Sequence, residues 1–154
     1  MTPPLSSTAI ATAIAMLLIF PALGADSLGQ VSLSIYVEEE SGKALVVGCI
    51  DDPKCLPFLN ASEQIYEEET GLLYAVTDSL IKTEEAASIL EFPLRGHFDE
   101  YHAVFYIPGG FELQEIDCSQ GLEFLSSSYN GSLVLDVHGF DQSDPTVAIS
   151  YQAA

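Results

Sequence analysis

The chain contains three cysteines, Cys49, Cys55 and Cys118, whose spacing bears on redox, metal-binding and structural roles. Redox and zinc sites are typically marked by Cys-x-x-Cys or by cysteines clustered with histidines, and neither pattern occurs here. Cys49 and Cys55 bracket Ile-Asp-Asp-Pro-Lys, a segment that can turn back and bring the two sulfurs together. We therefore predict a structural disulfide between Cys49 and Cys55. Cys118 is then buried, free, or the true partner of one of the other two.

Three histidines, His97, His102 and His138, lie near acidic residues in the sequence, which suggests a zinc or catalytic cluster. In a strand, however, His97 and His102 would point to opposite faces, and no His-Glu-x-x-His motif is present to fix a metal. We therefore predict surface or loop histidines. We predict that the protein has no cofactor. Calcium binding is the alternative hypothesis, because Asp51-Asp52 and the stretch 141–144 supply hard oxygen ligands in loops.

Motifs for enzymatic chemistry are missing from the sequence. Gly-x-Ser-x-Gly, which presents a nucleophilic serine on a sharp turn, does not occur, and neither does a glycine-rich phosphate loop. Carboxylate pairs such as Glu84-Glu85 are unremarkable in a chain with 23 acidic residues. We therefore predict a protein that is not an enzyme, with no catalytic residues and no metal ligands.

Two asparagines, Asn60 and Asn130, begin Asn-Ala-Ser and Asn-Gly-Ser, which match the N-glycosylation acceptor pattern. Both lie in predicted loops, so they are candidate glycosylation sites. Asn130-Gly131 is also a strong hairpin signal, because both residues tolerate the positive φ of a type I′ turn. That role alone explains Asn130.

The first 25 residues carry no charged side chain and include the apolar run Ala9 to Phe20. Pro21 follows, with small residues such as Gly24 and Ala25 that suit a peptidase site. No basic residue precedes the run, whereas signal peptides usually have one. We predict that residues 1–25 are a signal peptide cleaved near Gly24 or Ala25, or a retained N-terminal anchor. The protein would be secreted or extracytoplasmic, an oxidising setting that favours the disulfide.

The charged residues all follow this segment and give the chain a formal net charge of -19. Only three lysines and Arg95 oppose the 23 acidic residues. Such a field excludes nucleic acid as a partner, because nothing could neutralise its phosphates. Contact with a membrane is expected only through residues 1–25, if they are uncleaved. The acidity itself indicates solubility in a saline medium, or binding of cations or a basic partner.

We predict that residues 26–154 form one acidic domain. Their apolar residues fall into short runs in which every second residue is apolar, a pattern that indicates strands. Val31 to Val37 and Ala44 to Ile50 read as a hairpin, and the second run is apolar enough for a buried strand. Thr83 to Ala86 could begin a helix, but we predict a strand from about Ala87, stopped by Pro93. The fold class is all-β, an antiparallel β-sandwich of about eight or nine strands, immunoglobulin-like or a related Greek key, after an N-terminal hydrophobic leader helix.

One part of the sequence also resembles a known group of domains. His97 to Gly110, which contains Tyr-Ile-Pro-Gly-Gly, is followed by Ile116, by Gly121-Leu122-Glu123-Phe124 and by Val147 to Tyr151. Residues 86–151 thereby resemble extracytoplasmic β-sandwich domains of archaeal membrane-anchored proteins, some joined to winged-helix modules. The resemblance implies a cell-envelope location.

The leading functional prediction is a non-enzymatic extracytoplasmic binding or envelope-structural domain, with an unknown protein or cell-surface partner. The first alternative is a filament or surface-layer subunit, held by its N-terminal hydrophobic segment or by strand exchange through an exposed edge. The second alternative is a secreted enzyme whose site the sequence does not mark.

Overall fold

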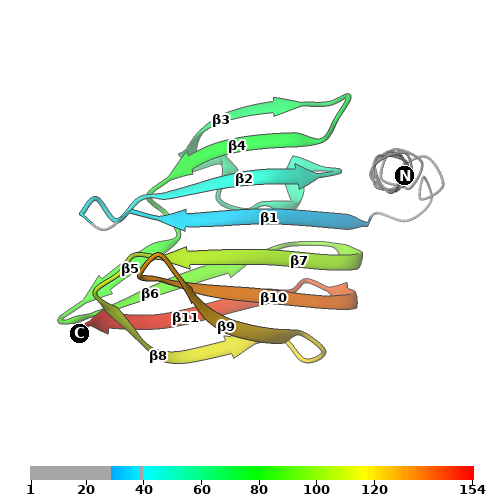
Figure 1. Ribbon diagram of the computed structural model, residues 1–154. Helices are drawn as coiled ribbons and strands as arrows, with labels where there is room; N and C mark the ends of the chain where they lie inside the picture. Colours follow the sequence, from blue (N-terminus) through cyan, green and yellow to red (C-terminus); the bar gives the residue numbers. More distant parts are fainter. Residues whose placement is uncertain (1–28, 39) are drawn as a thin grey trace, which may run out of the picture.

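The computed structural model describes residues 29–38 and 40–154, so the predicted leader, residues 1–25, lies outside the described part. Within that part, no helix is long and apolar enough to cross a membrane. Eleven strands form two sheets (Figure 1), which confirms the all-β fold class. The strands are β1 (Gln30–Val37), β2 (Ala44–Ile50), β3 (Ser62–Glu67), β4 (Leu72–Thr77), β5 (Ile81–Glu84), β6 (Ala87–Pro93), β7 (His97–Ile107), β8 (Phe111–Cys118), β9 (Glu123–Tyr129), β10 (Ser132–Ser143) and β11 (Thr146–Ala153).

The larger sheet has seven strands in the order β3-β4-β2-β1-β7-β10-β9, and the smaller has four in the order β5-β6-β11-β8. Every neighbouring pair is antiparallel except β1 and β7, which run parallel with Leu33 opposite Ala103. The predicted sandwich was antiparallel throughout, and this pair departs from it. β1 is therefore held between one neighbour from its own hairpin and one from the second half of the chain.

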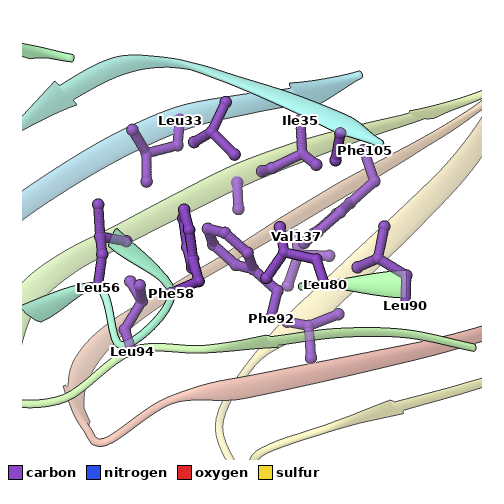
Figure 2. Close-up of a cluster of buried hydrophobic side chains, with 14 of the residues drawn as sticks. Leu33, Ile35, Leu56, Phe58, Leu80, Leu90, Phe92, Leu94, Phe105 and Val137 are labelled. Atoms are coloured by element: carbon purple, nitrogen blue, oxygen red, sulfur yellow. The ribbon is translucent and has the colours of Figure 1, made fainter. Parts of the chain in front are cut away.

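The core lies between the two sheets, where alternate residues of each strand turn inward. From the larger sheet Leu33, Ile35 and Phe105 are buried, and from the smaller sheet Leu90 and Phe92 meet them (Figure 2). The rings of Phe92 and Phe105 contact edge to face, with centroids 5.6 Å apart. The connection from β2 to β3 contains two short 3₁₀ helices, η1 (Pro53–Cys55) and η2 (Leu59–Ala61), and contributes buried side chains to one end of the core.

Several local predictions are confirmed and others are corrected. Asn130 and Gly131 have φ values of 50° and 82°, and they join β9 to β10 as the predicted tight hairpin. The strand from Ala87 is β6, which ends at Pro93. The prediction of eight or nine strands was too low. Thr83 and Glu84, the first two residues of the stretch considered as a helix start, lie in β5. Its short run Ile-Lys-Thr-Glu lacks the alternation that marks a strand.

The hydroxyl of Tyr101 in β7 is buried and has no hydrogen-bond partner within the described part of the chain. Burial, followed by the charge of Cys118, raises the pKa of Tyr101 far above its usual range. A buried donor without a partner costs about 1–3 kcal/mol. We expect Tyr101→Phe to raise the free energy of unfolding by about 1 kcal/mol, measured by denaturant titration.

The matched control for this prediction is Tyr66→Phe. The hydroxyl of Tyr66 is used, because it lies 2.9 Å from the carbonyl oxygen of Ile50 and 3.0 Å from that of Asp51. Its removal is expected to lower stability by about 1 kcal/mol. A loss of stability in Tyr101→Phe equal to that in Tyr66→Phe would show that the Tyr101 hydroxyl is satisfied in solution.

Candidate functional site

The outer face of the seven-stranded sheet, which points away from the core, carries two of the three histidines. His102 in β7 and His138 in β10 lie directly opposite each other in the strand register. Nε2 of His102 donates to Oδ1 of Asp136 at 2.9 Å, and Nε2 of His138 lies 3.7 Å from Oε2 of Glu123. All four side chains are partly exposed. The prediction of surface histidines is confirmed for both.

A shallow groove of about 390 Å³ runs past these histidines. Its walls include Asp136 and Glu100, together with two apolar side chains, Leu125 and Phe140, that are 68% and 69% exposed. The histidine and carboxylate pairs form the polar part of the groove, and the exposed apolar side chains lie beside them. Such a surface can bind a partner, but it does not exclude water from a reacting group.

The third histidine, His97, lies at the start of β7 and is also exposed. Its Nδ1 is 2.9 Å from Oγ of Ser143, its Nε2 is 2.8 Å from Oδ1 of Asp141, and Asp99 stands 3.6 Å from the same nitrogen. This serine, histidine and aspartate arrangement was not recognised from the sequence, because the β7–β10 register creates it. The carboxylate side chain of Asp141 is 85% exposed, so bulk water screens the charge that a catalytic histidine would need.

Two of the acidic residues considered for calcium, Asp52 and Asp144, have hydrogen-bond partners within the chain. Oδ1 of Asp52 accepts from the backbone N–H of Lys54 at 2.9 Å, and Oδ1 of Asp144 accepts from Gly96 N–H at 2.8 Å. Within residues 29–38 and 40–154, no three His, Cys, Asp or Glu side chains converge to hold a metal ion. Calcium binding therefore gains no support from these loops, and it stays a hypothesis.

The three cysteines are free thiols in the structure. Cys49 is exposed on the outer face of β2, whereas Cys55 in η1 packs partly against the core. Burial, then the charge of Asp51, raises the pKa of Cys49, and burial, then Asp52 and Asp51, raises that of Cys55. Both thiols are thus protonated at neutral pH and weakly nucleophilic. The predicted Cys49–Cys55 disulfide stays a prediction.

The two candidate glycosylation sites lie on the surface. Asn60 is exposed within η2, and Asn130 is exposed in the β9–β10 turn. The hydroxyl of Ser62, the third residue of the first acceptor sequence, donates to the carbonyl oxygen of Phe58 at 2.7 Å. Both asparagines are accessible to modification, and their glycosylation stays a prediction.

The most unusual feature of the outer face is a set of apolar side chains that crosses six neighbouring strands, from β3 to β10. At a strand spacing of about 4.8 Å, the set extends about 24 Å across the sheet. Its most exposed members are Ile65 at 72%, Leu72 at 49% and Tyr74 at 48%. We call it the apolar band, and it consists of Tyr36, Leu45, Val47, Ile65, Leu72, Tyr74, Val76, Val104, Tyr106 and Val134.

No charged side chain interrupts the two central rows of the apolar band. One row pairs Ile65 with Tyr74, Tyr74 with Val47, Val47 with Ser34, and Ser34 with Val104. Asp136 stands next after Val104 at the far end of this row. This stretch is uncharged although the chain has 23 acidic residues. Contiguous exposed apolar patches on soluble proteins typically mark interaction sites.

Within the apolar band, Tyr36 and Tyr106 stack on each other with centroids 4.5 Å apart and ring planes at 7°. Partial desolvation, followed by the neighbouring Tyr36, raises the pKa of Tyr106. The Tyr106 hydroxyl is therefore harder to ionise than an ordinary tyrosine hydroxyl. Stacked rings on adjacent strands also hold each other in place, which lowers the entropy cost of binding there.

The sequence did contain a signal for the apolar band. The run Ala44 to Ile50 was interpreted as suited to a buried strand, but only its alternate residues Ala44 and Val46, with Ile50, are buried. Leu45 and Val47 face outward and are half-buried. A strand at the surface normally has apolar residues on its core face only. Where both faces of such a strand are apolar, the outer face is typically covered or binds a partner.

Comparison with protein-family models, curated proteins and solved structures found no match for this chain.

Proposed function

We propose that this chain is a non-enzymatic extracytoplasmic binding or envelope-structural domain that docks a protein partner on the apolar band. The single observation that carries the proposal is the uncharged apolar band on the outer face of the seven-stranded sheet, in a chain of net charge -19. Removing apolar surface from water contributes about 25 cal/mol per Å², and no charged group within the central rows has to be desolvated. The binding energy would come from that burial.

The chemistry of the partner follows from the rim of the apolar band. Glu63 and Glu67 flank it on β3, and Asp136 flanks it on β10. An acidic rim repels acidic proteins and favours a partner with an apolar centre and lysine or arginine residues around it. The partner class is therefore a protein with a basic-rimmed apolar surface, not a nucleic acid or an anionic lipid.

Two further parts of the proposal concern the fold and the cellular location. The two sheets around a shared core support a β-sandwich related to immunoglobulin-like or Greek-key folds. Residues 1–25 have the composition of a signal peptide or anchor, which supports a secreted or cell-surface location. The resemblance of residues 86–151 to archaeal extracytoplasmic domains supports the same address.

Photocrosslinking in the native host tests the docking proposal. A benzophenone amino acid placed at Tyr74, within the apolar band, is expected to form an adduct of one defined mass with a different protein. The matched control is the same amino acid at Thr83, which is exposed on β5 in the other sheet. Adding Ile65→Glu to the Tyr74 variant should reduce the adduct by about tenfold or more, because it buries an unpaired charge.

The outcomes are distinct. Equal yields from Tyr74 and Thr83, or an adduct yield unaffected by Ile65→Glu, would contradict docking on the apolar band. An adduct that contains only a second copy of this chain would contradict the proposed heterologous partner.

A further inference from the structure

The two sheets have four edge strands, and three of them carry charges along their length. β3 contains Glu63 and Glu67, β5 contains Lys82 and Glu84, and β8 contains three acidic residues. Charged side chains on an edge prevent pairing with another chain, because a strand added there would have to desolvate them. Three of the four edges are thus protected.

The fourth edge, β9, lacks this protection. Its sequence is Glu-Phe-Leu-Ser-Ser-Ser-Tyr, and Glu123 at its first position is the only charged residue. All seven residues are exposed, and within residues 29–38 and 40–154 β9 pairs with β10 on one side only (Figure 1). The unpaired backbone N–H and C=O groups of its free side are a template for another strand. No proline and no lysine interrupts them.

We propose that two copies of the chain associate through antiparallel pairing of β9 with β9, which joins their seven-stranded sheets into one. This inference uses the edge of the sheet and not the apolar band, so it does not rest on the proposed function.

The sequence of β9 fits itself when the two-fold axis passes through Ser126. Ser126 then lies opposite its own copy, Phe124 lies opposite Ser128, and Leu125 lies opposite Ser127. Each large apolar side chain faces a small one, which allows close packing without a clash. Phe124 and Ser126 lie on the core-facing side of β9 but are exposed, so the smaller sheet does not cover the space the second copy needs.

The charges also favour self-pairing in this register. The two copies of Glu123 fall at opposite ends of the paired strands, about 20 Å apart at 3.4 Å per residue. That separation exceeds the Debye length of about 8 Å at physiological salt, so their repulsion is screened. The overall charge of -19 on each chain still opposes association, and added salt is expected to strengthen the dimer.

A charge swap at Ser126 tests the pairing in the full-length chain. Two like charges directly opposite each other would stand about 5 Å apart, so Ser126→Glu and Ser126→Lys should each weaken the dimer by about tenfold or more. An equimolar mixture of the two variants should recover a heterodimer at least as tight as the wild-type dimer. Analytical ultracentrifugation measures the dissociation constant of the dimer in about 0.15 M and about 1 M salt. The four samples are the wild type, the two Ser126 variants and their equimolar mixture.

The design separates pairing from other causes of association. Ser126→Glu and Ser126→Lys change the net charge in opposite directions, so a net-charge effect cannot weaken both. All samples carry the same residues 1–28, so association through that segment would not respond to the swap. Thr83→Glu and Thr83→Lys on the charged edge β5 are the matched controls, and both should behave as the wild type.

Three results would overturn the inference. They are a wild-type chain that stays monomeric at millimolar concentration in about 1 M salt, Ser126 variants that dimerise like the wild type, or an equimolar mixture that does not recover dimerisation.

Amide hydrogen exchange gives a second measurement that needs no variant. Exchange in residues 123–129 should slow when the wild-type chain is concentrated, while exchange in the edge strand β3 should not change. Equal rates in β9 at both concentrations would also contradict the pairing.

Discussion

Replacement of Phe105 by alanine is expected to lower the free energy of unfolding by about 3–5 kcal/mol. Phe105 is fully buried on β7, and its ring meets that of Phe92 from the opposite sheet at a centroid distance of 5.6 Å. Phe92 in turn contacts Phe58 from the β2–β3 connection, with centroids 5.8 Å apart. Removing the Phe105 ring would therefore leave a cavity between the two sheets, beside the Phe92 ring on which Phe58 also packs. Sheets held by backbone hydrogen bonds cannot collapse fully into such a space, so most of the cavity cost would remain.

Urea or guanidinium titration of the purified protein measures this loss, with an unchanged m-value showing that the unfolding stays two-state. The matched control is Val104→Ala, the adjacent residue on β7, whose side chain is half-buried on the outer face. Its expected cost is below about 1 kcal/mol. Similar losses in the two variants would contradict the assignment of the inner and outer faces of β7.

The sequence predicted those parts of the fold that depend on local chemistry. Alternation identified the inward side of β1, and Asn130-Gly131 identified a hairpin, because each signal acts over a few residues. The parallel pairing of β1 with β7 was not predictable in the same way. Alternation shows which face of a strand is buried, but it does not show which distant strand lies beside it.

The same limit applies to the candidate sites. The surface placement of the histidines was predicted from their spacing and from the missing metal motif, yet the contact of His102 with Asp136 depends on the β7–β10 register. The apolar band likewise requires the order of six strands before its members become one surface. The scarcity of charges in β9, where only Glu123 is charged, is visible in the sequence, but the position of β9 at the end of the sheet is not.

Gly48 is the position where substitution by the smallest chiral residue should be most damaging. It lies in β2 beside β1 with φ of 152°, and a Cβ atom there would stand 2.1 Å from the carbonyl oxygen of Ser32 and 2.9 Å from Cα of Leu33. Both of these atoms belong to the backbone of β1, so no side chain can turn aside to make room. We expect Gly48→Ala to lower the free energy of unfolding by about 3 kcal/mol, from strain together with displacement of the β1–β2 pair.

Gly42→Ala separates the steric contribution from the backbone contribution. Gly42 also has a positive φ, 67°, but nothing lies within 4 Å of the position its Cβ would take. The stability cost of Gly42→Ala should therefore be the conformational penalty alone, about 1–2 kcal/mol.

We expect denaturant titration to show a larger loss of stability in Gly48→Ala than in Gly42→Ala. Hydrogen exchange of Gly48→Ala should be accelerated in β1 and β2 before other strands. Equal losses would mean that β1 and β2 can separate at Gly48 without cost, which is incompatible with the close approach of Ser32. Because β1 also carries the parallel pairing to β7, displacement at Gly48 should loosen the centre of the seven-stranded sheet and, with it, the arrangement of the apolar band.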